Sequence, residues 1–500
     1  MIVETVFSLF LVWFAWYAVN TYTKRRNMPP GPFPYPFLGN LPQIIAADPV
    51  MPFTELAKKY GDIYTLTLPD GRDGVVLNTA SLARDARRAG RQEDLAGRSE
   101  KISDPWRKMF GKDVLTSDYS SEFRFRKRVL LSALHVFGPA IEQVTDRARH
   151  AVDTMVEEIE SKPGHAFSPK ELMESAILVQ LWKWLTSKDV SLNDPTVKKL
   201  AEFAELFAKQ AILNPVFQLF PFLTYLPTSF SRDVQRAQEI RDSLFPPEYR
   251  VHRESYCPSV LRDLTDSFIS AYEKEISKEN SKDVGSIDDI PYLMLNVAMG
   301  GSETTSSSLT WFFLFIVLHP HVQTRIQEEL NEIVGRDRLP RWADLPNLPY
   351  LQATLCETQR ASNVIPVVTT DAYRDTTIAG YHIPKGTSIY LNLSKIHHDE
   401  REWVEPDEFR PKRFLDSDGK FVGWNKLHSF LPFGVGRREC PGPSLAKVMM
   451  FTFASVLLHR YNFLLPDGAE RPTTKVSFPA AILRPNDYQI VAKPRSFRIS

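Results

Sequence analysis

The sequence predicts a mainly α-helical protein with a small β portion, built as one large domain behind an N-terminal transmembrane helix. Three observations lead to this fold class. An apolar run followed by basic residues opens the chain; apolar residues then recur with a helical period, with few strand-like runs; and no second linker or repeat divides residues 37–500. A 43% hydrophobic content supports a large core, and a net charge of +1 gives no reason to expect a nucleic-acid partner.

The first segment, MIVETVFSLFLVWFAWYAVNTY, has the roughly twenty mainly apolar residues that a bilayer span needs. Basic residues 24–26 follow it, and positive charge after a span places the next domain in the cytosol. A cleaved signal peptide would carry its charge before the apolar run. A buried core helix is the alternative. We expect a transmembrane anchor at 1–22, a stiff basic and proline-rich linker at 23–36, and the main domain at 37–500.

Within the large domain, helical periodicity is clear in PTVKKLAEFAELFAKQAI and PHVQTRIQEELNEIVG. GDIYTLTLP, GVVLNT, TTIAGYHIP and TSIYLNL predict the few strands. The apolar stretch that begins between Ser286 and Pro291 and ends near Pro320 predicts a long buried helix. Gly300 and Gly301 interrupt it, at a cost of roughly 2 kcal/mol against alanine. A ligand that needs a thin helix would explain them.

The chain has three cysteines, too few for a disulfide framework, and Cys440 lies in the turn-rich sequence FGVGRRECPG. Gly434 and Gly436 let the backbone approach a flat object closely. Cys440 precedes a predicted helix, whose N-terminus and the nearby arginines favour a thiolate. A zinc site would need further CxxC or HxxxH ligands, which are missing here. A buried structural cysteine and a nucleophile with a distant histidine base stay open.

This stretch resembles the haem-ligand signature of the cytochrome P-450 family, FGxGxRxCxG. The resemblance implies that Cys440 is the axial thiolate of a haem b iron. It places the following residues around the cofactor: Phe433, Gly434, Arg438 and Gly442.

Two further motifs occur in the order that this family shows. Glu357 and Arg360 lie one helical turn apart, and Arg413 follows in a PxRF sequence; the resemblance implies a buried network that holds the haem-loop region. Glu303 and Thr304 follow the paired glycines, and the resemblance implies that they deliver protons to dioxygen. A solvated polar face at a kink is the alternative for the second motif.

The sequence departs from the family pattern at positions that usually contact the haem propionates. The WxxxR motif has Phe123 and Lys127 in place of tryptophan and arginine, with Arg126 or Arg128 as a candidate substitute. Phenylalanine has no N–H to donate. A Pro-His pair common in relatives is replaced by Thr369 and Thr370. These departures leave haem affinity less secure than the fold.

The resemblance is to the microsomal animal clan that holds aryl-hydrocarbon and steroid 17α-hydroxylases. It implies a monooxygenase of the endoplasmic reticulum membrane, acting on a steroid-like or polycyclic lipophile with electrons from NADPH through a flavoprotein reductase. Cytochrome b5 is a second candidate donor, and basic residues 124–128 with Lys447 are a candidate docking face. The implied pocket includes Asn296, Gly300, Ile365, Val367 and Ala480.

Two alternatives remain from the sequence. A hydroperoxide-rearranging enzyme or isomerase of the same fold commonly lacks the acid–alcohol pair, so Glu303 and Thr304 count against it. A non-catalytic haem or lipid binder would need no proton relay, and the propionate departures keep it open.

Overall fold

The computed structural model places the chain in two compact units, which we call the sheet unit and the helical unit. The sheet unit comprises Met1–Ser99, Val367–Ile396 and Gly434–Glu439, and the helical unit comprises Glu100–Pro366, His397–Phe433 and Cys440–Ser500. The structure describes residues 2–47, 52–88, 90–98, 104–137, 141–219, 223, 226–278, 285–476 and 481–495.

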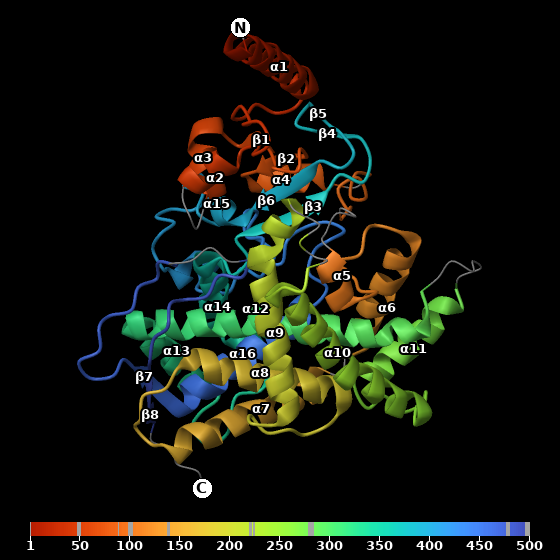
Figure 1. Cartoon of the computed structure of the whole chain (residues 1–500). Helices are drawn as coiled ribbons and strands as arrows, with labels where there is room; N and C mark the ends of the chain where they lie inside the picture. Colours follow the sequence, from red (N-terminus) through yellow and green to blue (C-terminus); the bar gives the residue numbers. More distant parts are fainter. Residues whose placement is uncertain are drawn as a thin grey trace. The chain divides into compact units, whose positions relative to one another are not determined.

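The sheet unit contains a four-stranded sheet in the order β1-β2-β6-β3 (Figure 1). Strands β2 and β6 are parallel, whereas the two outer pairs are antiparallel. Every residue of β2 is buried, as expected for an inner strand. The elements of the sheet unit are α1 Ile2–Arg25, α2 Leu41–Ala47, α3 Pro52–Tyr60, β1 Ile63–Thr67, β2 Asp73–Leu77, α4 Ala80–Ala86, β3 Val367–Asp371, β4 Thr376–Ile378, β5 Tyr381–Ile383 and β6 Ser388–Asn392.

The helical unit is almost entirely helical, with one small hairpin, β7–β8, near its C-terminal end. Its elements are α5 Asp104–Phe110, α6 Ser121–Phe137, α7 Ile141–Ser161, α8 Pro169–Thr186, α9 Pro195–Leu219, α10 Ser229–Glu254, α11 Leu264–Ile276, η2 Ile287–Asp289, α12 Ile290–Leu318, α13 Pro320–Ile333, η3 Trp342–Asn347, α14 Pro349–Ser362, η4 Pro411–Phe414, α16 Pro443–Arg460, β7 Tyr461–Leu464 and β8 Val491–Pro494. In helix α15, Leu393–His397, the residues up to Ile396 belong to the sheet unit and His397 belongs to the helical unit.

The mainly helical fold class with a small β portion is confirmed, as are the predicted strands and helices α9 and α13. The long central helix α12 also follows the prediction. Ser286 and Asp289 form a capping box just before it, and its last helical residue is Leu318, two residues before Pro320. It packs against α8, α10, α14 and α16, so most of its side chains are buried (Figure 1).

Candidate functional site

Cys440 lies at the surface of the helical unit, immediately before helix α16. Its backbone N–H donates to the carbonyl oxygen of Phe433 at 2.9 Å, and the N–H of Gly442 donates to its Sγ at 3.4 Å. The side chain is exposed, whereas Cys356 is buried in an apolar cluster, where burial raises the pKa of its thiol well above the usual value. An exposed sulfur that accepts an N–H bond at a helix N-terminus suits a thiolate ligand rather than a structural cysteine.

The glycines that precede Cys440 belong to the sheet unit and have left-handed backbone angles. Gly434 has φ +73° and Gly436 has φ +91°. A Cβ atom at Gly436 would lie 2.9 Å from the side chain of Arg87. Glycine is therefore required at position 436 by both its conformation and its neighbour.

Arg87 is a buried cation in the sheet unit, with 4% of its surface exposed. Its Nη2 donates to the hydroxyl of Thr370 at 3.2 Å, while its Nη1 has no hydrogen-bond partner among the described residues. Burial lowers the pKa of Arg87 to about 10, and no carboxylate offsets this effect. A buried guanidinium in this state needs an anion to be stable.

Two other arginines lie beside the same strand and loop. Arg98 Nη1 donates to the carbonyl of Thr369 at 2.8 Å, and Arg438 Nε donates to the carbonyl of Ala96 at 2.7 Å. We call Arg87, Arg98 and Arg438 the arginine cluster. All three arginines belong to the sheet unit, and Arg438 is two residues before Cys440 in the chain.

Arg87 and Arg98 were not predicted from the sequence. Their only sequence signal is the basic stretch RRAGRQEDLAGR, which reads equally well as a solvated surface. From the sequence, Thr370 was interpreted as replacing a histidine that relatives commonly have at this position. The structure shows that Arg87 donates to this threonine and brings a cation to the position.

Arg126, an expected substitute in the altered WxxxR motif, forms ion pairs with two carboxylates of the protein. Its Nε donates to Asp289 at 3.0 Å and its Nη2 to Glu122 at 2.7 Å, so two carboxylates neutralise this buried guanidinium. These contacts join α6 to the start of α12 and do not favour a cofactor role. Lys127 is half-buried, and Phe123 is buried.

One face of α12 is open, although the helix is otherwise buried. Asn296, Gly300 and Thr304 are spaced four residues apart, and each is at least partly exposed. The hydroxyl of Thr304 donates to the carbonyl of Gly300 at 2.8 Å. A Cβ atom at Gly300 would meet nothing within 4 Å, whereas one at Gly301 would lie 3.1 Å from Leu181. Gly300 thus faces open space, and Gly301 allows close packing with α8.

Asn296 also fastens the segment before α6. Its Oδ1 accepts from the N–H of Val114 at 2.9 Å, and its Nδ2 donates to Asp113 at 3.3 Å. Asp113 is fully buried and accepts from Thr116. Among the other expected pocket residues, Ile365 and Val367 are half-buried, and Ala480 lies outside the described residues.

Glu303 does not share the open face with Thr304. It is 7% exposed and pairs with Arg484, whose other nitrogen contacts Glu174 at 2.8 Å. Burial raises the pKa of Glu303, and the charge of Arg484 opposes that rise. The expected acid–alcohol pair is therefore split between two faces of α12.

The structure brings Glu357, Arg360 and Arg413 together in the helical unit. Arg360 donates to both oxygens of Glu357 at 2.7 and 2.9 Å, and Arg413 Nε lies 3.2 Å from the same carboxylate. Arg360 also donates to the carbonyls of His397 and Glu408. Both side chains of the central pair are fully buried. With every charge paired, this network supports structure and leaves no group for chemistry.

Fewer of the basic residues expected to form a docking face are exposed in the structure than the sequence suggested. Lys447 is half-buried, with Nζ 4.8 Å from the ring centre of Trp424 and 5.8 Å from that of Phe433, and burial lowers its pKa. Arg124 and Arg128 remain exposed on α6.

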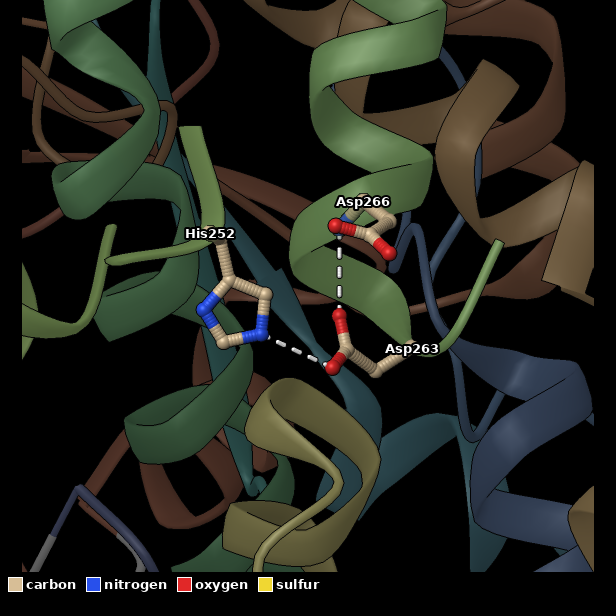
Figure 2. A group of neighbouring side chains, drawn as sticks. All are labelled: His252, Asp263 and Asp266. Carbon is tan, nitrogen blue, oxygen red and sulfur yellow. Dashed lines mark hydrogen bonds and ion pairs between the residues drawn. The ribbon is translucent and has the colours of Figure 1, made fainter. Parts of the chain in front are cut away.

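A second group of titratable residues, His252, Asp263 and Asp266, lies between α10 and α11 (Figure 2). His252 Nδ1 is 2.9 Å from the carbonyl of Glu248, and Nε2 is 2.9 Å from Asp263. Both partners can only accept, so both ring nitrogens must donate and the ring is an imidazolium. Burial opposes this charge, but Asp263 and Glu248 together outweigh the effect of burial, so the pKa of His252 is raised.

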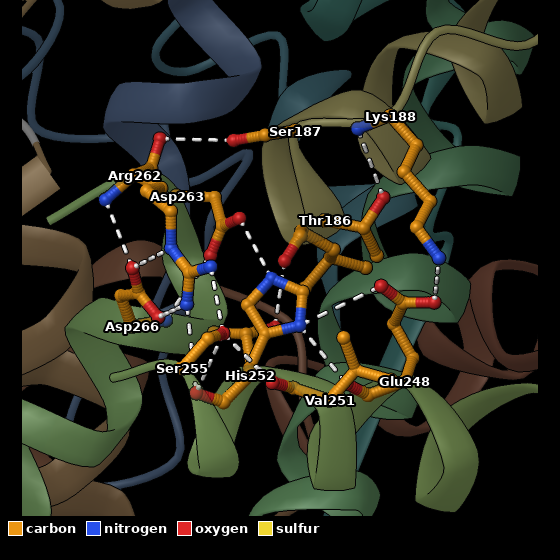
Figure 3. Close-up of polar contacts among 12 residues, drawn as sticks. Thr186, Ser187, Lys188, Glu248, Val251, His252, Ser255, Arg262, Asp263 and Asp266 are labelled. Carbon is orange, nitrogen blue, oxygen red and sulfur yellow. Dashed lines mark hydrogen bonds and ion pairs between the residues drawn. The ribbon is translucent and has the colours of Figure 1, made fainter. Parts of the chain in front are cut away.

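The same group has the spacing of a metal site but not its chemistry. Arg262 donates to both oxygens of Asp266 at 2.7 and 2.8 Å, and Glu248 accepts from Lys188 (Figure 3). An imidazolium has no lone pair for a metal, and Asp266 is already neutralised. We interpret the group as an ion-pair network that joins the C-terminus of α10 to the N-terminus of α11.

Comparison with known proteins agrees with the sequence motifs. The family model described as Cytochrome P450 matches residues 29–492. Steroid 17-alpha-hydroxylase/17,20 lyase of Ictalurus punctatus is 32% identical over 482 residues, covering 96% of this chain and 93% of that protein. Cytochrome P450 2D4 of Rattus norvegicus is 32% identical over 478 residues, covering 93% of each.

A solved structure of a zebra fish cytochrome P450 with progesterone has a TM-score of 0.76 and 29% identity. The match covers 89% of this chain and 98% of that chain. The chain therefore belongs to the cytochrome P450 family of haem monooxygenases.

Proposed function

We propose that this protein is a membrane-anchored monooxygenase that inserts one atom of O2 into a steroid-like lipophile, using electrons from NADPH through a flavoprotein reductase. The observation that carries the proposal is the exposed Cys440 sulfur at the N-terminus of α16, in the family's haem-ligand motif. The substrate class is supported by two relatives, a steroid 17-alpha-hydroxylase and a structure with progesterone.

Haem, when bound, supplies the oxidising chemistry, and the protein supplies position and electrostatics. Cys440 would hold the iron as a thiolate, stabilised by the Gly442 N–H and the start of α16. The arginine cluster would hold the propionates through charge-assisted hydrogen bonds.

The open face of α12 would receive the substrate, and the Thr304 hydroxyl on that face would deliver the proton that the reaction needs. Gly300 leaves space for a flat molecule beside the helix backbone. Thr304 can exchange its bond to the Gly300 carbonyl for a bond to water, which places a hydroxyl donor at the open face. The Glu303 carboxylate is paired with Arg484 on the neighbouring face of the helix. Glu303 would therefore have to break this ion pair before it could return a proton to Thr304.

The proposed location is the endoplasmic reticulum membrane, with α1 as the span and the remainder in the cytosol. Helix α1 is long and apolar enough to cross a membrane, and none of its apolar window is buried. Exposed Arg124 and Arg128 would attract the acidic surface of a reductase or of cytochrome b5.

The test is the carbon-monoxide difference spectrum of the reduced full-length protein, compared with Cys440→Ser and with Cys257→Ser as the control. Cys257 is also exposed but lies outside the motif. We expect the long-wavelength thiolate band in wild type and Cys257→Ser, and its loss in Cys440→Ser. An unchanged band in Cys440→Ser would refute the ligand assignment. A spin-state shift on adding progesterone would support the substrate class, and a screen of steroids without any shift would contradict it.

A further inference from the structure

A cavity of about 440 Å³ lies in the helical unit, where α13 and η4 both pack against α14 (Figure 1). Its lining includes His321, Arg325 and Glu329 from α13, Tyr350 from α14, Lys412 from η4, and Leu415 just after η4. None of these residues belongs to the arginine cluster, the open face of α12 or the Cys440 loop. Cavities that hold small molecules have volumes of about 300–1,000 Å³, so this cavity is large enough for a ligand of its own.

Glu329 is a buried carboxylate of the lining, and the protein already satisfies it. One of its oxygens accepts from the backbone N–H of Tyr350 at 2.8 Å, and the other accepts from that of Leu351 at 3.0 Å. The carboxylate therefore caps the start of α14, where the positive end of the helix offsets its charge. The cavity does not present Glu329 as an unpaired anion.

Tyr350 is buried as well, with 8% of its surface exposed. Within the part of the chain that the structure describes, its hydroxyl makes no hydrogen bond. Burial raises the pKa of Tyr350, so the hydroxyl keeps its proton at neutral pH and can donate it. A buried tyrosine hydroxyl usually has a partner. Its position in the lining therefore indicates a ligand that accepts a hydrogen bond.

Two permanent cations and a histidine form the solvent-exposed part of the lining. Lys412 makes no ion pair with any residue that the structure describes. Arg325 pairs with Glu328 at 3.2 Å, but both side chains are more than half exposed, so this pair is weak. The charge of Arg325 opposes the rise in pKa that burial causes at Tyr350, so it acts on the cavity. His321 adds an N–H donor in either protonation state.

Apart from Glu329, the polar side chains of the lining can all donate to a ligand. A guanidinium and an ammonium group hold phosphate oxygens through charge-assisted hydrogen bonds. A phosphate monoester carries about −1.5 to −2 charges at pH 7, which matches the two permanent cations. The cavity is larger than a phosphate group needs, and the ring of Tyr350, Pro349 and Leu415 provide apolar surface for an organic group.

We propose that this cavity binds a small organic phosphate monoester, with its phosphate group held by Arg325, Lys412 and the Tyr350 hydroxyl. The organic group would lie against Leu415. Because α14 and η4 also hold the buried network around Glu357, a bound ligand would stabilise this part of the helical unit by mass action.

The test uses the full-length, haem-loaded protein in detergent, with phenyl phosphate as the probe and inorganic phosphate and phenol as its two halves. Saturation-transfer NMR measures the binding of each probe, and the absorption spectrum of the haem reports binding at the haem site. Lys412→Gln and Tyr350→Phe each remove one donor from the cavity. Lys426→Gln is the matched control, because Lys426 is an exposed lysine of the helical unit outside the cavity. The carbon-monoxide spectrum of each variant verifies its fold.

We expect phenyl phosphate to bind more tightly than inorganic phosphate, without any change in the haem spectrum, and phenol not to bind. Lys412→Gln and Tyr350→Phe should each weaken the binding of phenyl phosphate about tenfold or more, because each loses a hydrogen bond to a charged group. Lys426→Gln should bind it as wild type does.

Wild-type affinity in both cavity variants, or equal weakening in Lys426→Gln, would overturn the site. A shift of the haem band that follows the NMR titration would place the probe at the haem and would overturn it as well. Inorganic phosphate binding as tightly as phenyl phosphate would contradict the proposed contact of the organic group.

Discussion

Replacing Arg87 by methionine should raise the stability of the haem-free protein and weaken its binding of haem. Burial lowers the pKa of Arg87 from the ordinary value of a guanidinium to about 10. At about 1.4 kcal/mol per pKa unit, keeping this guanidinium charged costs the fold about 3 kcal/mol. The cost is complete at pH 7, where the group is protonated both folded and unfolded. It declines as pH rises above 10, because the folded state then releases its proton first.

With haem bound, the same cation would gain a carboxylate partner. A hydrogen bond to a charged group contributes about 1.5–3 kcal/mol, which corresponds to about 10- to 150-fold in affinity. We therefore expect Arg87→Met to lose haem about 10- to 150-fold faster than wild type, while the haem-free protein becomes more resistant to urea. A packing defect alone would weaken both properties.

Haem loss can be followed as transfer to an excess of apomyoglobin, with urea unfolding of the haem-free protein measured in parallel. Arg88→Met is the matched control, since Arg88 is the next residue, is exposed and forms its ion pair with Asp85 at the surface. Arg87→Lys keeps a cation and should fall between wild type and Arg87→Met. If Arg87→Met releases haem at the wild-type rate, Arg87 does not bind the propionates and the reasoning fails.

Three further outcomes are expected. Thr304→Ala should uncouple NADPH oxidation from product formation and release peroxide; tight coupling would remove Thr304 from the proton path. The imidazolium of His252 has a raised pKa, so its stabilisation is complete below pH 6.5 and is lost as pH rises through the folded-state pKa. His252→Gln should flatten this part of the pH–stability curve, and an unaltered slope would contradict the assignment. Glu357→Gln leaves Arg360 buried without its partner and should cost about 3–5 kcal/mol in thermal or urea unfolding, whereas the exposed Glu332→Gln should cost nothing measurable.

The features that depend on spacing along the chain could be predicted from the sequence. The bounds of α12 follow from the apolar run and Pro320. The pairing of Glu357 with Arg360 follows from one helical turn, and the place of Arg413 in their network was implied by the resemblance to the family. Cys440 stands out for the same reason, because its glycines and arginine are close neighbours in the chain.

The features that depend on distant neighbours could not be predicted. Glu303 and Thr304 look like one unit in the sequence, yet successive helical residues point about 100° apart. The partner of Glu303, Arg484, lies 181 residues later. Arg87 is one of several basic residues in its segment, and only its contact with Thr370 and Gly436 distinguishes it.

The two glycines of α12 differ in how freely each could be replaced by a larger residue. An alanine at Gly301 would push against Leu181, so that position is constrained by packing. An alanine at Gly300 would touch no protein atom and would strengthen the helix by roughly 1 kcal/mol. A methyl group at residue 300 therefore requires no repacking of neighbouring elements. With the open face of α12 proposed as the place that receives the substrate, Gly300→Ala would be a single-site means of narrowing the range of molecules that the enzyme accepts.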